Sequence, residues 1–200
     1  GLADGILPNM ARFAETGFAT LADGVVPSFT NPNNLSIVTA APPAVHGIAG
    51  NFFLDPETGN EVMMNDPAFL RAESVLAAFS RDGAQVVVIT AKDKLRRLLG
   101  HGIEGGICFS SELAGGCTMD ENGIEDVLDL VGAPQPEVYS AELSLFVMEA
   151  GIRILERDRP TIMYLTLTDY IQHKYSPGSP EADTFYKAID DAAGRLANLG

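Results

Sequence analysis

Three groups of polar side chains follow apolar segments of this sequence and could do chemistry there. Thr30 lies in the polar stretch SFTNPNN, just after the segment GVVP. Lys92 and Lys94 follow the apolar run VVVIT, and Asp169 and His173 follow TIMYLTLT. A hydroxyl, two ammonium groups, a carboxylate and an imidazole could together bind a divalent cation and an anionic substrate.

Asp169 and His173 are four residues apart in the sequence TDYIQH. A carboxylate and an imidazole at this spacing can converge on one metal ion, and zinc favours such oxygen and nitrogen ligands. The alternative is a loop aspartate that caps a turn and a histidine on the surface. The spacing alone leaves both interpretations open.

Thr30 precedes the apolar run LSIVTA, which predicts a short helix. A threonine hydroxyl is a poor nucleophile unless a base or a metal ion lowers its pKa. A helix N-terminus and a metal ion would both favour the alkoxide, and backbone N–H groups there could hold a phosphoryl oxygen. The alternative is a helix cap or a turn residue.

Lys92 and Lys94 lie two residues apart in TAKDKL. They share a side if this segment is extended, whereas they point about 200° apart if it is helical. The alternative is a solvated helix start. Asn51, in HGIAGNFFLDP, could donate a hydrogen bond to a phosphoryl oxygen or could serve as a turn residue. His46 and His101 are not assigned to a site.

The elements that must position these residues alternate between helices and short buried strands. Apolar segments predict strands at residues 84–90, 106–110 and 161–168, and residues 18–27 are predicted as a further strand-like piece before Thr30. This alternation predicts an α/β fold, with a mostly parallel sheet flanked by helices. Ligands of such sheets bind beyond the carboxyl ends of the strands, where all three groups lie.

Composition sets limits on the function. The chain has 200 residues, 46% of them hydrophobic, and a formal net charge of −14. We expect residues 1–200 to form one domain, or a large piece of one. The negative charge argues against a nucleic-acid partner, and no apolar run approaches the roughly 18 residues of a membrane span. The first ten residues lack a leader pattern, which predicts a cytoplasmic protein. Cys108 and Cys117 are expected to be free thiols.

Residues 26–56, VPSFTNPNNLSIVTAAPPAVHGIAGNFFLDP, resemble the nucleophile segment of the alkaline phosphatase superfamily, in its nucleotide pyrophosphatase/phosphodiesterase branch. TDYIQH resembles a metal motif of that branch. Two features, the Asn-Pro-Asn-Asn after Thr30 and the paired lysines of TAKDKLRRLLGHG, are similar to the phosphonoacetate hydrolases, which break a carbon–phosphorus bond. The similarity runs from about residue 5 to the C-terminus.

The resemblance implies a role for each candidate residue. Thr30 would be the metal-bound nucleophile, and Asn51 would donate to a phosphoryl oxygen. Asp169 and His173 would ligate one of two zinc ions. The paired lysines, residues 92 and 94, would hold the carboxylate of a small anionic phosphonate substrate.

The sequence departs from this family in its metal ligands. Members have a further aspartate at the end of a first strand, before the position of GILPNM, and an Asp-His pair and a final histidine after the last helix predicted here. None of these occurs in the 200 residues. We therefore expect an internal piece of a longer enzyme, a partial domain lacking its N-terminal strand and its C-terminal metal-binding part. Alone, it should bind zinc weakly and turn over slowly.

Two other functions stay open at this stage. The first is a nucleotide pyrophosphatase or phosphodiesterase, which would need an apolar or aromatic slot for a second ester group instead of a carboxylate clamp. The second is a non-catalytic α/β module that binds a ligand or partner. The sequence also leaves the oligomeric state open, a dimer included.

Overall fold

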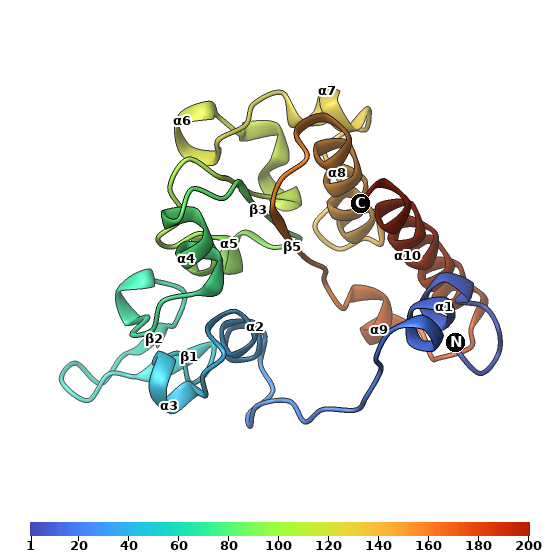
Figure 1. Cartoon of the computed structure of the whole chain (residues 1–200). Helices are drawn as coiled ribbons and strands as arrows, with labels where there is room; N and C mark the ends of the chain where they lie inside the picture. Colours follow the sequence, from blue (N-terminus) through green and yellow to red (C-terminus); the bar gives the residue numbers. More distant parts are fainter.

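A three-stranded parallel sheet forms the centre of the computed structural model, which describes residues 1–200 (Figure 1). Strand β3 (Val86–Thr90) lies between β4 (Ile107–Ser110) and β5 (Ile162–Thr166). Both pairings are parallel. Every residue of β3 is buried, whereas the residues of β5 are half-buried. β3 is therefore the central strand of the sheet.

The remaining elements are helices and one hairpin. The antiparallel hairpin joins β1 (Phe52–Leu54) to β2 (Glu61–Met63). The α-helices are α1 (Pro8–Thr16), α2 (Thr30–Thr39), α3 (Pro43–His46), α4 (Val75–Arg81), α5 (Asp93–Leu99), α6 (Met119–Asn122), α7 (Val127–Val131), α8 (Glu142–Asp158), α9 (Tyr170–Lys174) and α10 (Pro180–Leu199). Two 3-10 helices are η1 (Pro67–Phe69) and η2 (Ser111–Gly116).

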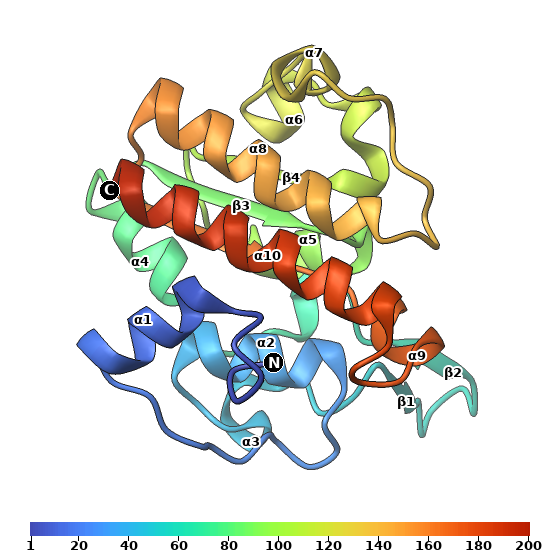
Figure 2. The same ribbon diagram turned by 90° about the vertical axis from the view of Figure 1, so that its right-hand side faces the viewer.

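Helices cover both faces of the sheet because successive side chains of β3 point to opposite faces. Val87 and Ile89 pack into a core with α7 and α8. Val86 and Val88 pack into a second core with α2, α4 and α5. Helix α10 packs along α8, and α1 packs against α10 (Figure 2). The structure confirms the predicted α/β class with a parallel sheet flanked by helices.

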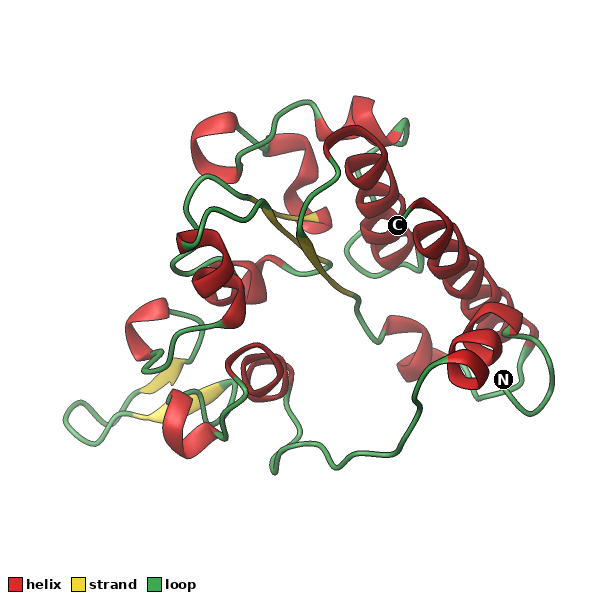
Figure 3. Ribbon diagram, in the orientation of Figure 1, coloured by secondary structure: helices red, strands yellow, loops and turns green.

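The segment before Thr30 differs from the prediction. Residues 18–27 form no strand, and Phe18, Leu21 and Val26 are almost fully exposed. An extended segment needs a neighbouring strand to satisfy its backbone groups, and none lies beside this one. Figure 3 shows the segment as a long loop that leads from α1 to α2. Helix α2 also begins at Thr30, earlier than the predicted run LSIVTA.

No helix of the chain combines the length and the apolar character that crossing a bilayer requires.

Candidate active site

The predicted residues meet at the carboxyl edge of the sheet. Two cavities of about 430 and 310 Å³ adjoin there, beyond the ends of β3 and β5. Both are lined by the N-terminus of α2, the start of α5 and the chain after β5. Five residues line both cavities: Thr30, Lys92, Leu95, Thr168 and Asp169. This edge is where an open parallel sheet offers ligand sites.

Thr30 is the first residue of α2 and is exposed. It is not the helix cap, because Phe29 holds that position in an extended conformation and no side-chain cap hydrogen bond forms. The hydroxyl therefore lies at the positive end of the helix dipole without a capping duty. This arrangement suits a nucleophile better than the capping alternative.

The asparagines after Thr30 fix the start of α2. The Asn31 side chain is buried and donates to the Met64 carbonyl at the end of the hairpin, at 2.8 Å. The Asn34 side chain accepts a 2.8 Å hydrogen bond from the Tyr164 hydroxyl of β5 and donates to the Thr30 carbonyl. Burial raises the pKa of Tyr164, so the phenol remains a donor. The Asn-rich turn thus ties α2 to the hairpin and to the sheet.

His46 supports α2 through a buried hydrogen bond and lines neither of the two cavities. It is fully buried, its Nε2 lies 3.0 Å from the Ser36 hydroxyl of α2, and its Nδ1 accepts from the Ile48 N–H. Burial lowers the pKa of His46, which favours the neutral ring. These contacts agree with the sequence analysis, which did not assign His46 to a site.

Asn51 lies just before β1 and lines the smaller cavity together with Thr30. Its Oδ1 atom is buried and has no hydrogen-bond partner in the chain. An unpaired buried amide oxygen costs about 1–3 kcal/mol, and rotation of the amide would present its NH₂ group in the same place. The polar end of Asn51 is therefore free for a ligand.

The paired lysines lie at the start of α5. Lys92 is the extended residue before the helix, and Lys94 lies in its first turn. Both line the smaller cavity. The Lys92 ammonium donates to the Val138 carbonyl at 3.0 Å and lies 4.8 Å from the centre of the Tyr139 ring. Both lysines therefore line a cavity that Thr30 also lines.

Asp169 and His173 lie at the start of α9 and within it, and they contact each other. His173 Nε2 is 3.0 Å from Asp169 Oδ2, and the two side chains are 79% and 72% exposed. Asp169 lines both cavities with Thr30, whereas His173 lines neither and reaches the site through its contact with Asp169. Their role as metal ligands stays a prediction.

The pair has donor chemistry that fits zinc. Zinc bonds of 2.0–2.1 Å put two ligand atoms of a tetrahedron about 3.3 Å apart, near the 3.0 Å found here. The Thr30 hydroxyl is a further oxygen donor on the same cavity as Asp169. No cluster of three or more acidic, histidine or cysteine side chains that could hold a metal occurs among residues 1–200. The chain thus offers two ligands of these types and one hydroxyl.

Three cavity residues escaped the sequence reasoning. Glu112 accepts a 2.8 Å hydrogen bond from the Asp93 N–H and so caps α5 beside the lysines. Val138 and Tyr139 contact Lys92 from the loop before α8. These residues come from an acidic, loop-rich stretch without periodicity, so the sequence held no signal that could have placed them.

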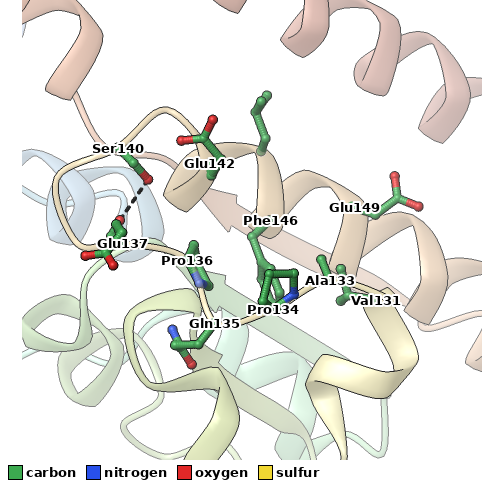
Figure 4. A pocket seen from close by; sticks show the side chains of 11 residues that line it. Val131, Ala133, Pro134, Gln135, Pro136, Glu137, Ser140, Glu142, Phe146 and Glu149 are labelled. Carbon is green, nitrogen blue, oxygen red and sulfur yellow. Dashed lines mark hydrogen bonds between the residues drawn. The ribbon is translucent and has the colours of Figure 1, made fainter.

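A separate cavity of about 450 Å³ lies on the other side of that loop, against α8 (Figure 4). It is mostly apolar, and its only hydroxyl, that of Ser140, donates to the Glu137 carbonyl at 2.8 Å. Its one hydroxyl is therefore engaged with the backbone. Its lining residues are Val131, Ala133, Pro134, Gln135, Pro136, Glu137, Ser140, Glu142, Leu145, Phe146 and Glu149.

The chain is similar to known proteins in sequence. A family model described as type I phosphodiesterase / nucleotide pyrophosphatase matches residues 2–199. The chain belongs to this family. A pyrophosphatase/phosphodiesterase of Schizosaccharomyces pombe, itself described as uncharacterised, is 24% identical over 201 residues, which are 96% of this chain and 36% of that protein.

Two solved structures are much closer to this member of the type I phosphodiesterase family. They show phosphonoacetate hydrolase from Sinorhizobium meliloti 1021, one in complex with phosphonoformate and the other with phosphonoacetate. This chain is similar to them at 55% and 54% identity, each with a TM-score of 0.95 over its whole length. It spans 49% of those chains, about half their length. The predicted resemblance to this branch is confirmed.

Proposed function

We propose that this chain, as one catalytic domain, takes part in hydrolysis of the carbon–phosphorus bond of phosphonoacetate to acetate and phosphate. The observation that carries the proposal is the 310 Å³ cavity that Thr30 shares with Lys92 and Lys94. It places a free hydroxyl at a helix N-terminus beside two lysines, which can bind a carboxylate. The 55% identity to an enzyme solved with phosphonoacetate supports this substrate.

Thr30 acts as the nucleophile in this proposal. Its Oγ1 forms a bond to phosphorus while the carbon–phosphorus bond breaks, and the electron pair of that bond leaves with the carbon. The Thr30 proton passes to solvent water as the oxygen attacks, and the carbanion takes up a proton from water to give acetate. Water then cleaves the phosphothreonine and releases phosphate. The N-terminus of α2 favours negative charge at this position throughout.

Lys92 and Lys94 bind the substrate carboxylate. The carbanion that leaves is tolerable only as an enolate, whose charge spreads onto that carboxylate. A lysine held there stabilises the charge as it develops, by analogy with an oxyanion-hole donor, whose removal costs about 2.7–4 kcal/mol of barrier. Asn51 donates from its free amide to a phosphoryl oxygen, which fixes the phosphorus end.

Asp169 and His173 hold zinc in this proposal, with Thr30 beside them. When bound, zinc supplies Lewis-acid stabilisation of negative oxygen and favours the ionised hydroxyl. Two zinc ions are proposed for the working enzyme, by the resemblance to its superfamily. Zinc binding requires a neutral imidazole and an ionised carboxylate, so affinity should fall in acid.

Phosphate release from phosphonoacetate tests the proposal directly. The full-length protein, loaded with zinc, should release equal amounts of phosphate and acetate, and its Lys92→Ala variant should lose this activity by about 10²–10³-fold. The same variant should keep any activity on nitrophenyl phosphate, which has no carboxylate for the lysine to bind. Equal loss of both activities would contradict the assigned role of Lys92, and no phosphate release by the wild type would contradict the proposed reaction.

A phosphodiesterase is the second candidate, and one observation favours it. A cavity of about 570 Å³ is lined by Tyr139, Tyr170, Tyr175 and Phe185, and it shares Tyr139 with the lysine cavity. Such an aromatic slot could hold the second ester group of a diester. Faster cleavage of a bis-nitrophenyl phosphate diester than of phosphonoacetate would favour this candidate. A protein that binds zinc and phosphonate but cleaves neither would fit the non-catalytic module.

The remaining expectations stay predictions. A small anionic phosphonate is the proposed partner. Cell fractionation would test the cytoplasmic location, and sedimentation would determine the oligomeric state.

A further inference from the structure

The Lys92 ammonium is held by two neutral groups. Its Nζ donates to the Val138 carbonyl at 3.0 Å and lies over the ring of Tyr139 at 4.8 Å. An ammonium has three donors, so this arrangement leaves two for a ligand. Lys94, by contrast, is exposed and makes neither a hydrogen bond nor an ion pair.

Lys92, like the other three lysines of this acidic chain, forms no ion pair with a carboxylate. The sequence has 27 aspartate and glutamate residues, and Glu112 and Asp169 line the same cavity. Neither forms an ion pair with Lys92, since Glu112 caps α5 and Asp169 pairs with His173. A carbonyl and an aromatic ring restrain an ammonium without neutralising it, whereas a carboxylate would compete with an anionic substrate.

The loop that carries these two groups is anchored on both sides. Before them, Gln135 donates to the Ser111 carbonyl at 2.6 Å and accepts from the Gly115 N–H at 2.8 Å. After them, the Ser140 hydroxyl accepts a 3.3 Å hydrogen bond from the Leu143 N–H of α8. It also donates to the Glu137 carbonyl within the loop, as the dashed line in Figure 4 shows. The ring of Tyr139 is 77% exposed, so the fold does not depend on burying it.

We propose that Tyr139 is a positioning residue, which with the Val138 carbonyl holds the Lys92 ammonium in place and so gives the site its preference for phosphonates that carry a carboxylate. This inference rests on the proposed function and adds a residue and a specificity role to it. Lysine has a long flexible stem, and fixing it before the ligand arrives removes an ordering cost from binding.

The test compares two ligands that differ in one group. Phosphonoacetate carries a carboxylate, and methylphosphonate does not. Calorimetric titration of the zinc-loaded protein should show that Tyr139→Leu raises the Kd for phosphonoacetate by about two- to fivefold, the range of an exposed cation–π contact. The Kd for methylphosphonate should stay unchanged. Tyr139→Phe, which keeps the ring, should behave like the wild type.

A double-mutant cycle separates positioning from a general effect on the structure. In a Lys92→Ala background, Tyr139→Leu should cause no further loss, because the group it positions is gone. Equal weakening of both ligands, an additive double variant, or a Tyr139→Phe variant as weak as Tyr139→Leu would each overturn the inference. Tyr139→Gln provides the same comparison if the leucine variant does not fold.

The positioning role of Tyr139 and the proposed hydrolysis of phosphonoacetate can be tested separately. A wild-type protein that does not prefer phosphonoacetate over methylphosphonate would overturn both. A wild-type protein that shows the preference, with a Tyr139→Leu variant that shows it equally, would overturn the role of Tyr139 alone.

Discussion

The hydroxyl side and the lysine side of the cavity are built differently. On the hydroxyl side, the side chains of Thr30, Asp169 and His173 are exposed, and the side chains of the last two hydrogen-bond only to each other. On the lysine side, Lys92 is half-buried and held by the Val138 carbonyl and the Tyr139 ring. The backbone is fixed on both sides, but among the reactive side chains only Lys92 is held in place, since Lys94 is exposed and unpaired.

This difference has a physical reason. A divalent cation orders its own ligands when it binds, so the carboxylate and imidazole need not be held beforehand. A lysine brings a single charge on a flexible stem, and the protein itself must place it. The two sides therefore make different demands, and the predictions below test this contrast from the largest effect to the smallest.

Removing the nucleophile should give the largest effect. Thr30→Ala should lower the rate of phosphate release from phosphonoacetate by about 10³-fold or more, because alanine removes the attacking oxygen. Thr30→Ser, which keeps a hydroxyl, should retain part of the rate. A Thr30→Ala variant that is as active as Thr30→Ser would show that the hydroxyl is not the nucleophile.

Zinc affinity should depend on the exposed pair, Asp169 and His173. Asp169→Asn and His173→Gln should each weaken zinc binding by about tenfold or more, measured by competition with a coloured chelator. His101→Gln changes an exposed histidine outside the site and should leave zinc affinity unchanged. If the control weakened binding as much as the pair, zinc would be bound elsewhere on the chain.

The backbone that carries Thr30 should be stabilised by the contact between α2 and β5. Tyr164→Phe removes the hydrogen bond to Asn34 and should lower the free energy of unfolding by about 0.5–1.5 kcal/mol, measured with urea. Tyr186→Phe is the matched control, since the Tyr186 hydroxyl makes no hydrogen bond within the chain. If both variants lost the same free energy of unfolding, the hydrogen bond from Tyr164 to Asn34 would not be the cause of the loss.

A smaller effect should follow pH. Burial lowers the pKa of His46 below its ordinary 6.5, so the unfolded chain takes up a proton at a higher pH than the folded one. Stability from this group is full well above pH 6.5 and falls as the pH drops through this value, by at most about 0.4 kcal/mol between pH 6.5 and 6.0. An NMR titration of the metal-free protein should give a His46 midpoint below 6.5, and a midpoint above 6.5 would contradict the burial argument.

Much of the fold was predictable because its strands are short, apolar and flanked by clear helix signals. β3 and β4 follow the predicted boundaries closely. The strand predicted at residues 18–27 was wrong because apolar residues such as Leu21 and Val26 suggested burial where no partner strand exists. Local pattern cannot reveal whether a neighbour is present.

The site was predictable where a residue follows a strand or a distinctive motif, as Thr30, Lys92 and Asp169 do. It was not predictable where a distant loop folds back onto the cavity. Val138 and Tyr139 lie 46 and 47 positions after Lys92 in the chain, and only tertiary packing brings them together. Contacts of this kind leave no periodicity or spacing in the sequence.

Trapping the covalent intermediate tests the central claim most directly. The zinc-loaded protein should be mixed with phosphonoacetate, quenched in acid during turnover, digested and analysed by mass spectrometry. The account predicts a phosphate group on Thr30 that appears before free phosphate accumulates and is absent from the Thr30→Ala protein. Phosphate release without any phosphorylated Thr30, or with phosphate on another residue, would contradict it.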